Sequence, residues 1–177
     1  EIGHGFDDQG SEYDELGNLH EWWTPEDKAA FKQRSEKLVA QYDDFEPRDL
    51  PGESVNGSLT VGENIGDLGG LTIGHKAYLI SLGEDPAAHA VDVPPAPAVA
   101  RSQEEWTGSQ RVFLNWAHCW RAKSRKELAL QRLAVDPHSP PEFRANIVRN
   151  LDEFHEAFGT GPGDGLWLDP EDRVRIW

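Results

Sequence analysis

The stretch that most constrains the fold is LTVGENIGDLGGLTIGHKAYLISL, residues 59–82, because its apolar residues recur at α-helical spacing. The positions that share this period are Val61, Ile65, Leu68, Leu71 or Thr72, Tyr78, Leu79 and Leu82. Five glycines interrupt the pattern between residues 62 and 74, and each costs about 1 kcal/mol relative to alanine inside a helix. We expect a helix that keeps so many glycines to pack closely against a neighbour beside a functional site.

The remaining patterns also favour helices. Thr24, Pro25 and Asp27 form a helix start signal, and apolar spacing then predicts a helix over residues 25–44. Helical periodicity returns from residue 102 and again at residues 150–158, whereas the Pro- and Ala-rich residues 83–101 resemble an exposed loop. A little β structure is expected near residues 11–23 and 55–61. The predicted fold class is mainly α with minor β.

Length and charge narrow the function. A chain of 177 residues favours one domain. With 32 acidic against 17 basic side chains and a formal charge of −15, it would repel nucleic acid and anionic lipid. The acidic excess suggests a solvated surface and, as an extra hypothesis, a preference for cationic peptides. No apolar run approaches the roughly 20 residues of a membrane span.

The single cysteine, Cys119, lies within an aromatic helical pattern and is predicted to be buried and structural.

The first residues, EIGHGFDDQG, contain the spacing E-x-x-H at Glu1 and His4. A hydrolytic zinc site needs three protein ligands and an open position, and two histidines at i and i+4 on a helix supply two of them. The histidine required at i would lie one position before Glu1. If it is present, His4 is the second ligand and Glu1 lies beside the metal as a general base. Alone, this spacing is weak evidence.

The segment GENIGD offers a third ligand. Glu63 and Asp67 are spaced i and i+4, so one helix would present Glu63 to the metal with Asp67 behind it. Asp7, three residues after His4, is placed to hold the free ring nitrogen of that histidine. The alternative is that these carboxylates cap helices or lie in solvent, and for each carboxylate taken singly this alternative is favoured.

Four segments together carry a resemblance to a known family. EIGHGFDDQGSEYDELGNLHEWWT, GENIGDLGGL, DPHSPPEFR and the terminal RVRIW resemble successive signatures of the neprilysin family of zinc metallopeptidases, which are gluzincins. The resemblance implies that residues 1–177 are the C-terminal part of a thermolysin-like catalytic domain, cut just after the first histidine of HExxH. Val174 stands where animal members carry a cysteine, which implies a bacterial member.

Carried over by position, the resemblance assigns roles around zinc. Glu1 matches the catalytic glutamate, and His4 and Glu63 match the second and third zinc ligands. Asp7 and Asp67 match carboxylates that support the site, and Asp67 is counted with the catalytic group. With one ligand missing, the chain alone is expected to bind zinc weakly and to be inactive.

In DPHSPPEFR, His138 aligns with the histidine that stabilises the oxyanion, and Arg144 aligns with the arginine that binds a substrate carbonyl. The implied activity is a zinc metalloendopeptidase that hydrolyses oligopeptides through a metal-activated water. Peptides and the upstream part of the same polypeptide are the expected partners, and exposed apolar surface suggests homo-oligomers. A bacterial cytoplasmic location is expected. The alternative function is a non-catalytic binding module, or a folded fragment without activity.

Overall fold

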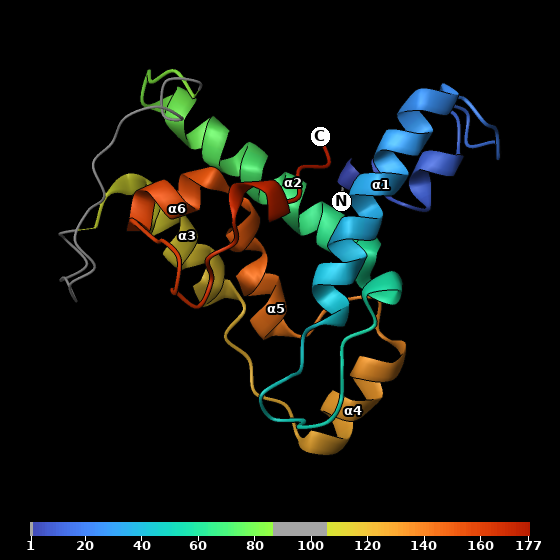
Figure 1. Cartoon of the computed structure of the whole chain (residues 1–177). Coiled ribbons are helices and arrows are strands. Elements are labelled where there is room, and N and C mark those ends of the chain that lie inside the picture. Colours follow the sequence, from blue (N-terminus) through green and yellow to red (C-terminus); the bar gives the residue numbers. More distant parts are fainter. Residues whose placement is uncertain (1, 87–105) are drawn as a thin grey trace.

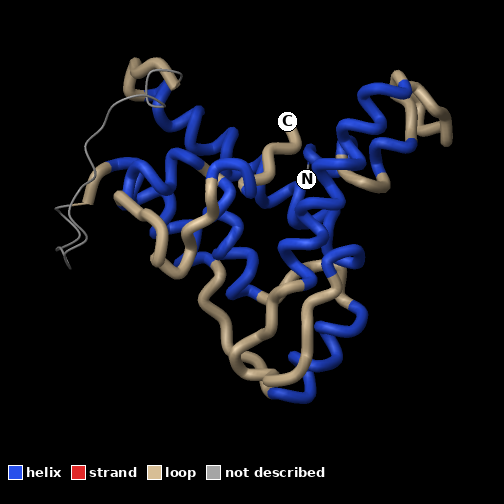
Figure 2. The backbone as a smooth tube through the Cα atoms, in the orientation of Figure 1, coloured by secondary structure: helices blue, strands red, loops and turns tan. Residues whose placement is uncertain are grey.

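The computed structural model describes residues 2–86 and 106–177, whose regular structure is helical (Figures 1 and 2). The α-helices are α1 (Pro25–Asp43), α2 (Gly57–Ser81), α3 (Gly108–Cys119), α4 (Lys126–Val135), α5 (Pro141–Ala145) and α6 (Asp152–Phe158). Shorter 3₁₀ helices are η1 (Ile2–Phe6), η2 (Gly10–Glu12), η5 (Asn146–Asn150) and η6 (Pro170–Asp172). The prediction of a mainly α fold is confirmed.

Side-chain caps fix where the long helices begin. The Thr24 hydroxyl accepts a hydrogen bond from the Asp27 N–H at 3.1 Å, so α1 begins at Pro25 as predicted. The Asn56 side chain accepts from the Leu59 N–H at 3.0 Å and starts α2 at Gly57. The β structure expected at residues 55–61 is therefore wrong, because this cap commits the segment to the helix.

The β structure expected at residues 11–23 is reduced, within the described residues, to one antiparallel bridge between Tyr13 and Leu19. Gly17, with a φ of +78°, makes the turn between them. Seven residues closed by a single bridge bury too few apolar side chains to extend into a sheet. The predicted loop at residues 83–101 falls mostly outside the described residues.

Helix α2 is the centre of the packing. Figure 1 shows it between α1 on one side and α3 and α6 on the other. Its apolar stripe packs into one cluster with residues from every side: Leu38, Tyr42, Val55, Val61, Ile65, Leu68, Leu71, Phe113, Phe143, Ile147, Val148, Leu151, Phe154, Val174 and Ile176. One helix thus carries both the centre of the core and the GENIGD segment.

The glycines of α2 have different reasons to be there. A Cβ on Gly62 would lie 2.7 Å from an Asp8 carboxylate oxygen, so the segment that carries His4 and Asp7 approaches α2 closely at this point. A Cβ at any of the other four positions would meet nothing within 4 Å in the described parts of the chain; these are Gly66, Gly69, Gly70 and Gly74. The expectation of close packing therefore holds at Gly62 alone.

Helix α4 differs from α2 because it contains no buried residue. Figure 1 shows it at the lower end of the molecule, joined to α3 by residues 120–125 and to α5 by residues 136–140. Cys119, at the end of α3, is exposed, so the prediction that it is buried is wrong. The helical period that suggested burial ends at this residue, and the chain turns away from the core.

Candidate active site

His4 and Asp7 are joined by a hydrogen bond. The His4 Nδ1 lies 2.7 Å from one Asp7 oxygen, while the other accepts from the Gln9 and Gly10 N–H groups at 2.9 and 2.7 Å. The hydrogen bond to Asp7 raises the pKa of His4. His4 lies on a 3₁₀ helix rather than the expected α-helix, because two glycines flank it and the Asp7 cap ends the segment. The contact with Asp7 fixes the ring and leaves Nε2 for another ligand.

Glu63 on α2 faces that free nitrogen. Its Oε1 lies 3.5 Å from the His4 Nε2, and its side chain is 19 % exposed. Two ligands bonded to tetrahedral zinc at about 2.0–2.1 Å lie about 3.4 Å apart. The separation of these two atoms, and their nitrogen and carboxylate chemistry, therefore fit two ligands of one zinc ion.

His138 approaches the other oxygen of Glu63. The His138 Nε2 lies 3.3 Å from Glu63 Oε2, and its Nδ1 lies 2.7 Å from an oxygen of Asp136. The same Asp136 oxygen accepts from the His138 N–H at 3.0 Å, and this hydrogen bond lowers the pKa of Asp136. Asp136 thereby holds the ring with its second nitrogen directed at Glu63.

Arg144 and Asp67 form a two-point pair beside Glu63. The Arg144 Nε and Nη2 each donate to a different Asp67 oxygen at 2.7 Å. Burial raises the pKa of Asp67, and the hydrogen bonds from Arg144 act against this rise. The guanidinium lies 4.0 Å from the ring centre of Trp120, and Nη2 lies 3.8 Å from Glu63. Asp67 and Trp120 together fix the plane of the guanidinium.

A buried hydrogen bond ties the loop of His138 to the helix of Glu63. The Ser139 hydroxyl donates to the side-chain oxygen Oδ1 of Asn64 at 2.8 Å. The side-chain Nδ2 of Asn64 donates to the Thr60 hydroxyl at 3.0 Å. Asn64 is completely buried. Because Asn64 and Ser139 directly follow Glu63 and His138, this contact holds the two candidate side chains at a fixed separation.

The predicted site residues thus lie around Glu63, with one exception. His4, His138 and Arg144 approach Glu63 from three separate segments, and Asp7 and Asp67 hold two of those groups. Glu1 lies outside the described residues. Within residues 2–86 and 106–177, no group of three His, Cys, Asp or Glu side chains is arranged to hold a metal.

Two residues of the site were missed by sequence reasoning. Asp136 precedes His138 by two residues, and this Asp-x-His spacing allows the carboxylate to accept both the ring and backbone hydrogens. Trp120 was interpreted only as an aromatic neighbour of Cys119, and no sequence signal links it to Arg144, 24 residues later.

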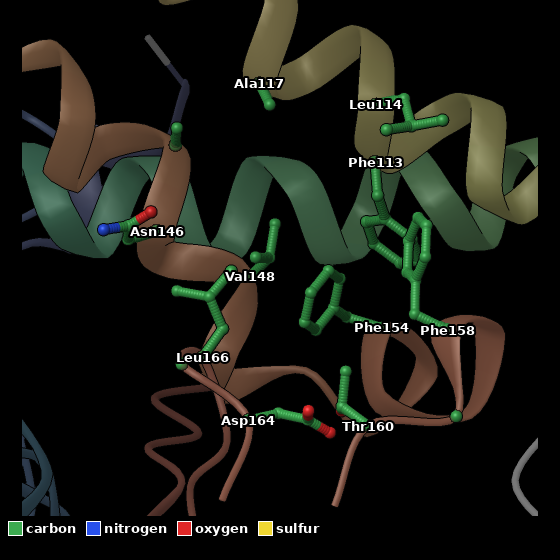
Figure 3. Close-up of a pocket in the computed structure, with 13 residues that line it drawn as sticks. Phe113, Leu114, Ala117, Asn146, Val148, Phe154, Phe158, Thr160, Asp164 and Leu166 are labelled. Atoms are coloured by element: carbon green, nitrogen blue, oxygen red, sulfur yellow. The ribbon is translucent and has the colours of Figure 1, made fainter. Parts of the chain in front are cut away.

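Two cavities lie near this part of the molecule. One of about 860 Å³ lies beside the site and includes Trp120, His138 and Arg144 in its wall. The other, of about 490 Å³, lies between α3 and α6 and is walled largely by apolar side chains such as Phe113, Phe154 and Phe158, as Figure 3 shows. None of the predicted site residues lines this second cavity, whereas His138 and Arg144 line the first.

Comparisons with known proteins decide the family. The sequence matches peptidase family M13 over residues 1–174. This chain belongs to peptidase family M13. Neutral endopeptidase of Lactobacillus helveticus is 36 % identical over 178 residues, covering 100 % of this chain and 23 % of that protein. Neprilysin-3 of Drosophila melanogaster is 34 % identical, covering 100 % of this chain and 21 % of that protein. The predicted membership of the neprilysin family is thereby confirmed.

The fold of this M13 chain is shared with solved structures. The crystal structure of Mycobacterium tuberculosis zinc metalloprotease ZMP1 in complex with inhibitor superposes with a TM-score of 0.86 at 53 % identity. The match covers 100 % of this chain and 26 % of that chain. The M13 chain thus spans about a quarter of the length of the relatives it matches.

Among the described helices, none combines the length and the apolar character needed to cross a lipid bilayer.

Proposed function

We propose that this chain is the C-terminal part of a zinc metalloendopeptidase that hydrolyses peptide bonds in oligopeptides. The observation that carries the proposal is the meeting of His4, Glu63 and His138, with 3.5 Å between His4 Nε2 and Glu63 Oε1. In this proposal His4 and Glu63 are two of three zinc ligands. A histidine directly before Glu1, which would be the third, stays a prediction from the sequence.

Zinc bound there would supply Lewis-acid polarisation of a water molecule and of the scissile carbonyl. Glu1 is proposed to take the proton of the attacking water and to pass it to the leaving amine. Its position next to the expected ligand is a prediction, because Glu1 lies outside the described residues. Asp7 accepts the Nδ1 hydrogen of His4, so the ring keeps the tautomer that offers Nε2.

His138 is proposed to donate from Nε2 to the oxygen that becomes negative during attack. When Nδ1 also donates to Asp136, donation from Nε2 requires a ring protonated at both nitrogens. The carboxylates of Glu63 and Asp136 lie on either side of the ring, at 3.3 Å from Nε2 and 2.7 Å from Nδ1. A donor fixed before the reaction costs no reorganisation when the charge develops.

Arg144 is proposed to bind a carbonyl of the substrate on the leaving-group side. Asp67 takes Nε and one hydrogen of Nη2, which leaves Nη1 free to donate to a ligand. Asp67 acts through Arg144 and is therefore a positioning residue in this account. The Trp120 ring lies against the guanidinium, with the ring centre 4.0 Å away, and lines the same cavity.

Two finer points belong to the same proposal. The chain by itself is inferred to hold zinc weakly and to be inactive, because a catalytic zinc site needs a third protein ligand. Of the two alternatives considered from the sequence, the proposal thus keeps the folded fragment without its own activity. A bacterial cytoplasmic location and self-association stay predictions.

The test is peptide hydrolysis by the complete polypeptide. An internally quenched oligopeptide should be cleaved, cleavage should stop with a zinc chelator, and added zinc should restore it. Glu63→Gln should lower kcat/KM by at least about 10³-fold, whereas Glu53→Gln, an exposed change before α2, should not. A wild-type protein that cleaves no peptide with zinc present, or a fully active Glu63→Gln variant, would refute the proposal.

A further inference from the structure

The cavity beside the candidate site is unusually basic for this chain. Its volume is about 860 Å³, within the range of ligand pockets, and Arg121, Lys123, Lys126 and Arg132 line it beyond Trp120. Residues 121–132, RAKSRKELALQR, contain five of the 17 basic residues of a chain whose net charge is −15, and only one acidic residue. Positive charge is therefore concentrated in the wall of this cavity.

The described chain engages these cations only in part, since Arg132 adds to the hydrogen bonds from His138 in lowering the pKa of the Asp136 carboxylate. Within the described residues, Lys123, Lys126 and Arg132 form no ion pair, and all three are exposed. Two of the acidic residues in the same wall are already engaged, Asp136 by His138 and Glu142 by Arg48 at 3.0 Å. Among the basic residues of this wall, Arg144 is paired with Asp67 and Arg121 contacts His118 at 3.3 Å, whereas Lys123 and Lys126 form no ion pair in the described chain.

The direction of a bound peptide is inferred from the residues that share this cavity. His138 and Arg144 line it together with Trp120 and the basic residues, and the proposed function places the reacting carbonyl at His138 and a later carbonyl at Arg144. An extended peptide advances about 3.3 Å per residue. The residues after the scissile bond would then run along the rest of the cavity, where the basic side chains lie.

We propose that this cavity selects peptides with acidic side chains at the second and third residues after the scissile bond, through Lys123, Lys126 and Arg132. The inference rests on the proposed peptidase function and names its substrate class. It reverses the hypothesis of cationic substrates, because four exposed basic residues of one segment line this cavity. Exposed charges of this kind act partly through long-range attraction, so the selection depends on salt.

The test compares two internally quenched peptides on the complete zinc-loaded polypeptide. They are identical except for Glu or Gln at the second and third residues after the cleaved bond. The Glu peptide should have a kcat/KM about three- to tenfold higher at low salt, and the ratio should fall toward one in 0.5 M salt. Equal values at low salt, or a preference for Gln, would overturn the inference.

Substitutions in the cavity wall test whether its basic residues cause the preference for the Glu peptide. Lys126→Gln combined with Arg132→Gln should lower the Glu/Gln ratio at least twofold, and Lys32→Gln, a charge change on the exposed side of α1, should leave it unchanged. A ratio that survives the double substitution would contradict the assignment. If the wild-type protein cleaves neither peptide, the proposed function itself fails, and that result is distinct from cleavage of both at equal rates.

Discussion

The two sides of the candidate site are built in opposite ways. Helix α2 has ten buried residues, and its site residues Glu63 and Asp67 are held by partners from three other segments. Helix α4, which contributes to the cavity wall, has no buried residue, and its basic side chains form no ion pair in the described chain. Fixed partners on α2 hold a precise geometry for chemistry, whereas free charges on α4 can adapt to a ligand.

The largest effect expected from this difference is on stability. Arg144→Ala leaves the carboxylate of Asp67 buried without its partner, and breaking such a pair costs about 3–5 kcal/mol. Arg132→Ala removes the same side chain from α4 and should change the free energy of unfolding by less than about 0.5 kcal/mol. Urea unfolding of the chain measures both. Similar losses for the two variants would remove the distinction between the sides.

A smaller effect is expected where the two sides meet, at Asp136. Asp136→Asn keeps the shape but removes the negative charge that lies 2.7 Å from His138 Nδ1 and orients the ring. The complete polypeptide should lose about tenfold in kcat, with little change in KM, because the contact matters most in the transition state. Asp49→Asn, the same change in the same cavity wall away from His138, serves as the control. A change in KM without a fall in kcat would contradict this role of Asp136.

The α2 side could be predicted from the sequence because its information is local. The apolar period, the Asn56 cap and the i, i+4 spacing of Glu63 and Asp67 all lie within residues 56–82. The Thr24 cap likewise set the start of α1 correctly. Helices whose start signals and apolar stripes agree are specified by their own residues.

The opposite side could not be predicted, because its contacts are made across the fold. Trp120 contacts Arg144 only because α4 and the loop after it turn the chain back. Lys123 and Lys126 form no ion pair because α4 does not pack against the core of the described chain. The net charge of the chain is a sum over all residues, so it could not show that basic residues gather in the wall of one cavity. The exposed position of Cys119 was missed for the same reason, since helical spacing cannot show where packing stops.

The most direct test of the account is a calorimetric zinc titration of the metal-stripped complete polypeptide. The account predicts one tight site per molecule, at least about 100-fold weaker binding in Glu63→Gln, and wild-type binding in Glu53→Gln. The chain of residues 1–177 alone should bind zinc much more weakly than the complete polypeptide. Unchanged affinity in Glu63→Gln would show that the carboxylate facing His4 holds no metal, and the central claim would be wrong.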